Sequence, residues 1–252
     1  MGLLSLGCEG RLKVGVGVSE GVARAIERNL RSAKCKVEIF DFTSPQRLVR
    51  SLKDGDVDAA VRGTLRSSEI IRQLKKSYSL REVMRTAVLE DSRGRQFLLM
   101  PVGIDEGSNY RSRKSLVMET LSFFSPMDWK LSVGILSKGR SEDRNRGSGI
   151  RRSLEEGERM VKDLRLKGID AKHFEILIEK AAKESDLVVA PDGVSGNLIF
   201  RSMHFLGGTK AYGAPVVNIP DVFVDTSRAK ADFTDSVLLA AGLARARARL
   251  KL

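Results

Sequence analysis

The sequence predicts an α/β protein built on mostly parallel sheets, and three observations support this class. Over the first 76 residues, short apolar runs alternate with segments of helical periodicity, in the order strand, helix, strand, helix, strand, helix. Such alternation implies a parallel sheet whose strands are joined by crossover helices. Further along, the apolar run 187–190 ends at a Pro-Asp-Gly break and leads into another helical stretch. The chain has 252 residues, enough to bury one large core or two smaller ones.

The spacing of apolar side chains places the elements of the first 76 residues. Val22, Ile26 and Leu30 lie on one helical stripe, whereas residues 36–40 alternate as a strand does. Ser44 followed by Pro45 is a favourable helix start, because serine caps the first free N–H groups and proline lacks one. The expected strands are 12–18, 36–40 and 57–61, and the expected helices are 21–31, 45–55 and 67–76.

The middle of the chain changes character. Residues 83–89 and 96–102 are strand-like runs on either side of a Gly-containing turn, which predicts a hairpin. Ser153 and Glu156 have the spacing of a capping box, which predicts the start of a helix. The other elements expected here are a helix at 114–124, a strand at 131–136 and a long polar loop at 137–149.

The last third again reads as strands and helices. A mixed segment with a helical end covers 174–185 and is followed by the buried strand 187–190. A turn at 195–197 then leads into a helix from Leu198 to about Leu206. A short strand at 215–219 and a final helix from about Phe233 follow.

Composition is that of a soluble globular protein. Hydrophobic residues make up 42% and charged residues 30%, and no apolar run approaches the roughly 18 residues that a membrane span needs. The first ten residues lack the basic region of a secretory signal, so we expect a cytoplasmic protein. Cys8 and Cys35 lie far apart and are expected to be small apolar residues rather than a disulfide framework. No metal site is expected, because His173 and His204 are the only imidazoles.

The net charge of +12 attracts polyanions of several kinds. The basic residues are spread along the chain, few aromatic residues are interleaved, and no zinc finger or long Lys/Arg block is visible. An anionic small molecule is therefore the expected partner, in preference to nucleic acid, and no membrane partner is expected. Residues 15–21, GVGVSEG, place the third glycine one residue late for a dinucleotide fingerprint. A tight strand-to-helix turn is the preferred interpretation there.

Two polar segments follow predicted strands, at the edge where α/β sheets bind ligands. The first, Ser137-Lys138-Gly139-Arg140, combines a hydroxyl, two cations and a flexible glycine, which suit a phosphate. The alternative is a flexible basic loop. The second, Ser195-Gly196-Asn197, offers backbone N–H groups at the start of a helix. An ordinary capped helix is the alternative in that case.

A third candidate site lies near the C-terminal helix, at Ser227, Arg228, Asp232 and Asp235. Arginine can hold a phosphate or acyl oxygen, serine can hydrogen-bond a developing oxyanion, and aspartate can take a proton. The alternative is that these residues cap a helix and complement its dipole. The two histidines are not paired by spacing, and we expect them to be structural or surface residues.

Several stretches together resemble the phosphate acetyl/butyryltransferase family. They are KLSVGILSKG from Lys130, FEILIEKAAKESDLVVAPDGVSGNLIFRSMHFLGG up to Gly208, DTSRA at 225–229, and VRGT ending at Thr64. Their order along the chain is that of the family. The whole chain is still more similar to MtxX, a methanogen family whose name marks it as a methyltransferase subunit. AVLEDSRGRQFLLMPVGIDEG and APDGVSGNLIFRSMHFLGGTKAYGAP carry that similarity.

For the fold, the resemblance implies the phosphate acetyltransferase-like arrangement, which is related to that of isocitrate and isopropylmalate dehydrogenases. It has two α/β domains, the second inserted in the first, with the active site in the cleft between them. The expected first domain is 1–108 with 224–252, and the expected second domain is 109–223. Enzymes of this family are often dimers, so a homodimer is an expected assembly.

For the site, the resemblance implies that Ser227 and Arg228 bind and polarise an acyl phosphate. A following aspartate would help to deprotonate the thiol of coenzyme A, and Asp232 and Asp235 bracket the family's position. Arg62 and Thr64 match the first-domain Gly-Thr segment and would join the ligand-binding residues. Coenzyme A or another phosphorylated ligand is the expected cofactor.

Three functions follow, and a transferase is the expected enzyme class. The first is a phosphate acyltransferase-like protein of methanogen type, which binds a phosphorylated or coenzyme-type anion in the cleft for group transfer. The second is a methyltransferase subunit of the MtxX type, linked to methanogenesis in archaea; the sequence shows no Gly-rich S-adenosylmethionine loop and no corrinoid-binding His motif. The third is a non-catalytic ligand sensor or assembly protein on the same fold.

Overall fold

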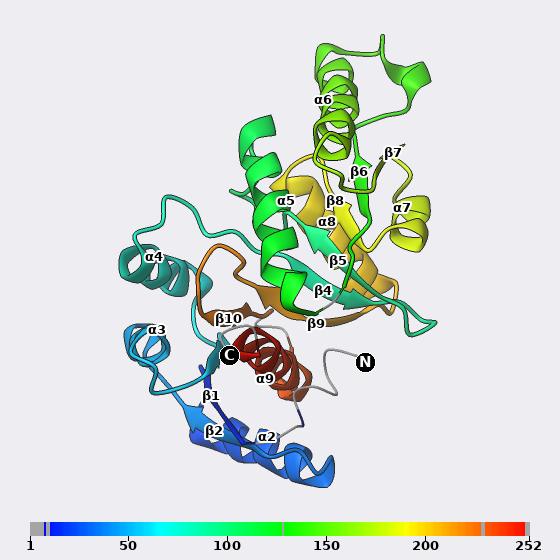
Figure 1. The fold of residues 1–252 in the computed structure, drawn as a ribbon. Coiled ribbons are helices and arrows are strands. Elements are labelled where there is room, and N and C mark those ends of the chain that lie inside the picture. The colour runs from blue at the N-terminus through cyan, green and yellow to red at the C-terminus, as the bar shows by residue number, and fades with distance from the viewer. Residues whose placement is uncertain (1–7, 9–10, 128, 228–229, 250–252) are drawn as a thin grey trace. The chain divides into compact units, whose positions relative to one another are not determined.

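The computed structural model describes residues 8, 11–127, 129–227 and 230–249 (Figure 1). The chain folds into two compact units, and each is described by itself. Unit 1 consists of Met1–Val83 and Tyr212–Leu252, and unit 2 consists of Met84–Ala211. The expected domain limits, at 108 and 223, stay a prediction, and the units divide the chain at other positions.

The sheet of unit 1 is parallel over β2, β1, β3 and β10, in that spatial order. The bounds of these strands are Val37–Asp41, Leu12–Val16, Ala59–Val61 and Val222–Asp225. The strand β9, Lys210–Pro215, pairs antiparallel with β10. The strand and helix alternation predicted for the first 76 residues is confirmed, and the helices after the first and second strands each bring the chain back to start a parallel strand.

Helices cover the sheet of unit 1 and build its core. They are α2 (Glu20–Ser32), α3 (Pro45–Lys53), α4 (Ser67–Tyr78) and α9 (Thr234–Ala248). Leu48 of α3 and Ile70 of α4 pack on Ala60 and Phe223 of the sheet. Successive strand residues point to opposite faces of the sheet, so the residues next to Ala60 and Phe223 in β3 and β10 face the other side. The helix α9 packs against these two strands. The predicted cap of α3 is confirmed, because the hydroxyl of Ser44 accepts a backbone N–H of the first turn.

Unit 2 begins with the predicted hairpin and continues as a parallel sheet. The strands β4 (Ala87–Glu90) and β5 (Gln96–Met100) are antiparallel. The strands β5, β8 (Leu187–Val189), β6 (Val133–Leu136) and β7 (Ala171–Glu175) then run parallel in that spatial order. The fold is therefore the mostly parallel α/β class that the sequence predicts.

The helices of unit 2 lie around this sheet (Figure 1). They are α5 (Tyr110–Phe124), α6 (Ser148–Arg165), α7 (Ile178–Glu184), α8 (Gly193–Arg201) and the short turns η1 (Ser125–Met127), η2 (Ser141–Asp143) and η3 (Ser202–Leu206). η3 is a π-helical turn that continues α8. None of the helices in the described ranges is both long enough and apolar enough to cross a membrane.

The starts of two helices in unit 2 differ from the prediction. The capping box expected at Ser153 and Glu156 is wrong, because α6 already begins at Ser148 and both residues lie inside it. α8 begins at Gly193 rather than at Leu198, because the side chain of Asp192 caps it. At α8, Asp192 and Ser195 both offer capping chemistry, whereas α6 begins after Gly147 with no side-chain cap, so a local capping pattern does not mark its start.

Two further predictions are corrected. The strand expected at 215–219 is displaced, because β9 ends at Pro215 and the following β10 starts at Val222. Cys8 and Cys35, expected to be separate apolar residues, form a disulfide, with their Cα atoms 4.2 Å apart. A sequence separation of 27 residues hides this proximity, which depends on the path of the chain in three dimensions.

Candidate functional site

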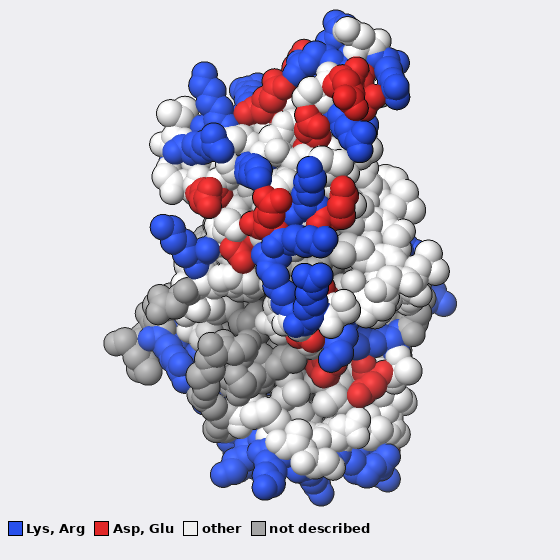
Figure 2. All heavy atoms as spheres, turned by 90° about the vertical axis from the view of Figure 1, so that its right-hand side faces the viewer, with Lys and Arg blue, Asp and Glu red and all other residues white. Residues whose placement is uncertain are grey.

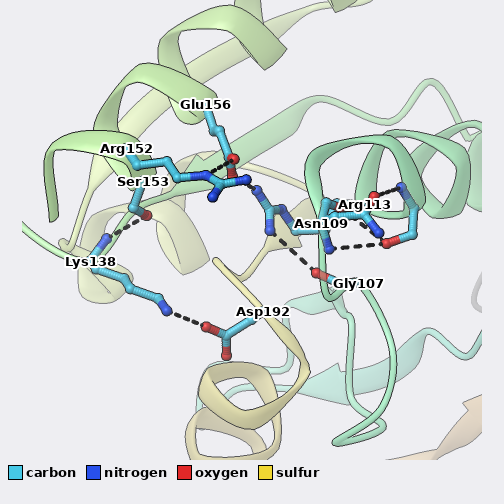
Figure 3. A network of polar contacts seen from close by, with 9 residues as sticks. Gly107, Asn109, Arg113, Lys138, Arg152, Ser153, Glu156 and Asp192 are labelled. Atoms are coloured by element: carbon cyan, nitrogen blue, oxygen red, sulfur yellow. Dashed lines mark hydrogen bonds and ion pairs between the residues drawn. The ribbon is translucent and has the colours of Figure 1, made fainter. Parts of the chain in front are cut away.

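The loops that follow β5, β8 and β6 meet at one edge of the sheet in unit 2, because these strands are parallel neighbours. Open α/β sheets bind their ligands at this carboxyl edge. The loop after β6, residues 137–147, is called the β6 loop, and the loop after β5, residues 101–109, is called the β5 loop. Figure 3 shows the polar contacts that join both loops to α5, α6 and the start of α8.

The β6 loop is held by hydrogen bonds from two neighbouring elements. The N–H of Ser137 donates to the carbonyl of Glu175 in β7 (2.6 Å), and the N–H of Lys138 donates to Ser153 Oγ in α6 (3.0 Å). The N–H of Ser141 donates to the Glu175 carboxylate (3.1 Å). Glu175 has a φ of 57°, a left-handed conformation that costs energy in a non-glycine residue and persists only where contacts enforce it. The loop is therefore pre-organised.

Lys138 is the cation of this loop that lies at the start of α8, whereas Arg140 of the same loop pairs with Glu142 (3.5 Å). The Nζ of Lys138 lies 2.7 Å from Asp192 Oδ2, and its side chain is 49% exposed. The other carboxylate oxygen of Asp192 accepts the N–H of Ser195 (2.8 Å) and so caps α8. Burial opposes ionisation of Asp192, but hydrogen bonds from Lys138 and Ser195 outweigh it and hold its pKa below the ordinary value. An ammonium group and the start of a helix thus converge on one carboxylate.

The predicted residues Ser195, Gly196 and Asn197 lie inside α8 and dock it on the β5 loop. The N–H of Gly196 donates to the carbonyl of Asp192 (3.0 Å). A Cβ on Gly196 would lie only 1.9 Å from the carbonyl oxygen of Pro101, so glycine permits this close approach. The side-chain amide of Asn197 donates to the carbonyl of Val102 (2.8 Å). Their expected role in holding a ligand stays a prediction.

Sequence reasoning missed the buried ion pair that shapes the β5 loop. Arg85 Nε donates to Glu106 Oε1 (2.6 Å), and the other oxygen of Glu106 accepts the N–H of Gly103 (3.1 Å). Burial raises the pKa of Glu106, although Arg85 and Gly103 oppose this. Arg85 and Glu106 lie in different elements, so no local pattern marks them as partners.

Arg113 and Glu156 form a second missed pair, between α5 and α6 (Figure 3). Arg113 also donates to the carbonyl of Gly107 (3.2 Å), which ties the β5 loop to this pair. Arg152 binds the same carboxylate from the exposed side (2.9 Å). Burial opposes ionisation of Glu156, yet the two arginines keep its pKa below the ordinary value. The signal in the sequence was Asn109, whose side chain caps α5 and fixes where Arg113 lies.

Each histidine contacts a nearby loop. His204 Nδ1 lies 2.8 Å from the carbonyl oxygen of Thr209 and holds the turn after η3. His173 Nε2 lies 3.1 Å from Ser137 Oγ at the start of the β6 loop. Burial lowers the pKa of His173, while the carboxylates of Glu158 and Glu175 oppose that shift.

Arg62 and Thr64 lie at the carboxyl edge of the sheet in unit 1. Arg62 is 5% exposed; it pairs with the carboxylate of Asp225 and donates to the carbonyl of Leu65 (2.8 Å). Thr64 donates to the carbonyl of Gly17 (3.2 Å). A Cβ on Gly17 would lie 2.2 Å from the carbonyl oxygen of Arg62, so the glycine-rich segment serves this close backbone contact.

The third candidate group also belongs to unit 1. Ser227 is half-buried, and its carbonyl accepts the N–H of Lys230 (3.2 Å), whereas Arg228 lies outside the described residues. Asp232 accepts the N–H (2.9 Å) and the hydroxyl (2.6 Å) of Thr234. Asp235 is exposed in the first turn of α9. Asp232 precedes that helix, so the two carboxylates do not share a helical face.

Charges of both signs are mixed over part of the face that Figure 2 shows. Figure 2 shows Lys and Arg standing among Asp and Glu over the upper part of the face in view, so the net charge of +12 is not gathered there into one continuous basic patch. Within the described ranges, no group of three or more His, Cys, Asp or Glu side chains is arranged to hold a metal ion. An anion at the carboxyl edge of unit 2 would therefore contact Lys138 as a single side chain and not as part of a broad basic surface.

Comparison with solved structures identifies the fold. The chain shares it with a branched-chain phosphotransacylase from Enterococcus faecalis, with a TM-score of 0.74, 14% identity, and coverage of 92% of this chain and 99% of that one. A phosphotransacetylase from Streptococcus pyogenes gives a TM-score of 0.66 at 13% identity, covering 99% and 97%. A 4-hydroxythreonine-4-phosphate dehydrogenase from Klebsiella pneumoniae gives 0.56 at 11% identity, covering 98% and 85%. The predicted resemblance to phosphate acyltransferases is confirmed for the fold.

Comparison with curated sequences identifies the family, whereas no family model matches the chain. The protein provisionally named methyltransferase mtx subunit X of Methanosarcina barkeri is 38% identical over 229 residues, covering 90% of this chain and 84% of that protein. Its counterpart in Methanosarcina acetivorans is 40% identical over 208 residues, covering 82% and 74%. A protein of Methanopyrus kandleri named as an uncharacterized methyltransferase is 36% identical, covering 92% and 99%. By this identity and coverage, the chain belongs to the MtxX family.

Proposed function

We propose that the chain binds a phosphorylated or coenzyme-type anion at the carboxyl edge of unit 2 and uses it in group transfer of the acyl or phosphate type. The observation that carries this proposal is the ammonium group of Lys138. It is half exposed at the edge where such sheets bind ligands, on a loop that Ser153 and Glu175 hold in place. Binding of an anion therefore does not require the loop to be ordered, which lowers the entropic cost of binding.

The ion pair with Asp192 does not preclude an anion. Ion pairs between exposed side chains stabilise a fold by only about 0–1 kcal/mol, and Lys138 is half exposed. A phosphate group carries more charge than a carboxylate and offers three acceptor oxygens, so it can replace Asp192 as the partner of Lys138. Asp192 keeps its second role, as the cap of α8. The pair with Asp192 thus holds the ammonium group of Lys138 in position until a more highly charged anion binds in place of the carboxylate.

The comparisons support two reactions. Solved structures named phosphotransacylase and phosphotransacetylase share this fold, which favours transfer between an acyl phosphate and a thiol. Transfer of a methyl group, in a subunit linked to methanogenesis, is the second candidate, because the curated relatives carry that name. The products of the two reactions distinguish them.

Calorimetric titration with inorganic phosphate, acetyl phosphate and coenzyme A tests the proposal. The wild-type protein should bind at least one of them, and Lys138→Ala should weaken that binding about 10- to 100-fold, the loss of one charged hydrogen bond of about 1.5–3 kcal/mol. Lys138→Arg keeps the charge and should bind more tightly than Lys138→Ala. An absence of binding to all three anions would exclude the proposed ligand class.

Lys172→Ala is the matched control for this experiment. Lys172 also belongs to unit 2, is 59% exposed, and pairs with the carboxylate of Glu184 at 2.6 Å. Its substitution removes an equivalent ion pair away from the carboxyl edge and should leave binding unchanged. Incubation of the wild-type protein with acetyl phosphate and coenzyme A, or with S-adenosylmethionine and a methyl acceptor, then tests for a thioester or a methylated product. A methylated product without a thioester would favour the second candidate.

A further inference from the structure

His173 lies behind the β6 loop, in β7, and no part of the proposed function uses it. Its Nε2 is 3.1 Å from Ser137 Oγ, 36 residues away in the sequence. Ser137 is only 2% exposed, so a substrate has no access to its hydroxyl and it is not a candidate nucleophile. The contact must be explained by its effect on the loop.

The hydrogen-bond inventory of Ser137 assigns the roles in this contact. A serine hydroxyl has one proton to donate and lone pairs that accept. The hydroxyl of Ser137 donates to the carbonyl of Gly139 (3.1 Å), which closes the turn around Lys138. A lone pair of Ser137 Oγ then accepts the Nε2–H of His173. That N–H is present in the imidazolium as well as in this neutral tautomer, so the contact survives a change in protonation.

The neighbouring helix provides room for the imidazole ring. Gly157 lies in α6, and a Cβ built there would be 2.6 Å from His173 Nε2 and 3.1–3.2 Å from two ring carbons. Any larger residue at 157 would require the ring to move from its place beside Ser137. The charged groups that act on His173 are Glu158 of α6, Glu175 of β7 and Arg144 of the β6 loop.

We propose that His173 is the positioning residue of the β6 loop: its Nε2–H holds the hydroxyl of Ser137, which closes the turn at Gly139 and thereby aims Lys138 at the anion. This inference rests on the proposed function for its effect on binding. The chain of contacts runs from the imidazole to one hydroxyl, one carbonyl and the backbone that bears Lys138. The backbone of Lys138 is still held by Ser153 and that of Ser137 by Glu175, so loss of His173 loosens the turn through the hydroxyl of Ser137 alone.

Three variants test this role by anion binding. His173→Ala should weaken binding up to about 10-fold, the loss of one hydrogen bond, whereas His173→Gln should restore it, because the glutamine amide can place a donor near the position of Nε2. Gly157→Ala should weaken binding to the same extent as His173→Ala. Helix propensity rises when alanine replaces glycine in α6, whereas the contact with His173 opposes folding, so the urea unfolding of this variant is measured beside its affinity. In the His173→Ala background, Gly157→Ala should have no further effect on affinity, since the ring that it displaces is gone.

Hydrogen exchange over residues 137–143 separates this inference from the proposed function. The amides of the loop should exchange faster in His173→Ala and Gly157→Ala than in the wild-type protein or His173→Gln, whether or not an anion binds. If the wild-type protein binds no anion but the exchange pattern holds, the proposed function fails and the positioning of the loop stands. Unchanged exchange and affinity in Gly157→Ala, or a glutamine variant as impaired as alanine, would overturn the role of His173.

Discussion

At the scale of single residues, the environment of Lys230 in unit 1 alters the chemistry of its ammonium group. Its Nζ donates to Ser236 Oγ (3.0 Å), whose own proton goes to the carbonyl of Tyr212 (2.5 Å). Burial lowers the pKa of Lys230, although Asp235 and Asp232 oppose the shift. A lysine with a lowered pKa is a better base and nucleophile than an exposed one, because more of it is neutral near pH 7.

The lowered pKa of Lys230 makes stability depend on pH in a stated direction. Between its lowered pKa and the ordinary lysine pKa of about 10.5, Lys230 is protonated more in the unfolded chain than in the folded protein. The stability of the folded protein therefore falls as the pH is lowered through this range. Lys230→Met removes this cost. Urea unfolding from pH 7 to pH 10.5 should show the wild-type protein gaining stability relative to the variant, by about 1.4 kcal/mol for each unit by which the pKa is lowered.

Lys76→Met is the matched control for Lys230→Met, because Lys76 is exposed on α4. Its unfolding free energy should follow that of the wild-type protein in parallel across the same pH range. A constant difference for Lys230→Met as well would contradict the buried environment of Lys230.

At the scale of elements, the docking of α8 on the β5 loop depends on glycine. In a free helix, alanine in place of glycine stabilises by about 0.5–1 kcal/mol. In Gly196→Ala the new Cβ would meet the carbonyl of Pro101 at 1.9 Å, and α8 would have to move off the loop. We expect this variant to lower the free energy of unfolding by about 1–3 kcal/mol, measured by urea denaturation.

Gly149→Ala provides the comparison for Gly196→Ala. Gly149 lies in α6, is exposed, and a Cβ there would meet nothing within 4 Å. This variant should be neutral or slightly stabilising, because only the helix propensity changes. Equal stability of the two alanine variants would show that α8 is not held closely against Pro101.

At the scale of the whole molecule, the disulfide between Cys8 and Cys35 joins residues 27 apart in the sequence. A cross-link of this span stabilises the folded state by about 2–4 kcal/mol, mainly by restricting the unfolded chain. We therefore expect a reducing agent to lower the melting temperature of the wild-type protein. Thiol titration of the denatured, unreduced protein should find no free thiol, since the chain contains two cysteines.

The double variant Cys8→Ser with Cys35→Ser serves as the control for reduction. Its melting temperature should be close to that of the reduced wild-type protein and should not respond to the reducing agent. Two free thiols in the unreduced wild-type protein would contradict the disulfide.

Local patterns were sufficient for the order and type of most elements. The helical stripe of Val22, Ile26 and Leu30, the cap at Ser44 and the turn before Gln96 each depend on residues close together in the sequence. Their physics is local, because periodicity and turn chemistry act over a few residues. The start of α8 was misplaced because Asp192 and Ser195 both suit a cap, and the contact of α8 with Pro101 decides between them.

The sequence by itself determined the α/β class, the parallel crossover units and the polar loop that bears Lys138. Only the tertiary structure decided what that loop meets: Asp192 at the ammonium group of Lys138, Ser153 at its backbone N–H and His173 at the hydroxyl of Ser137. The physical reason is that these contacts join strand ends far apart in the sequence, and the spatial order β5, β8, β6, β7 sets which ends are neighbours. A hydrophobic pattern marks each strand as buried but says little about its neighbours.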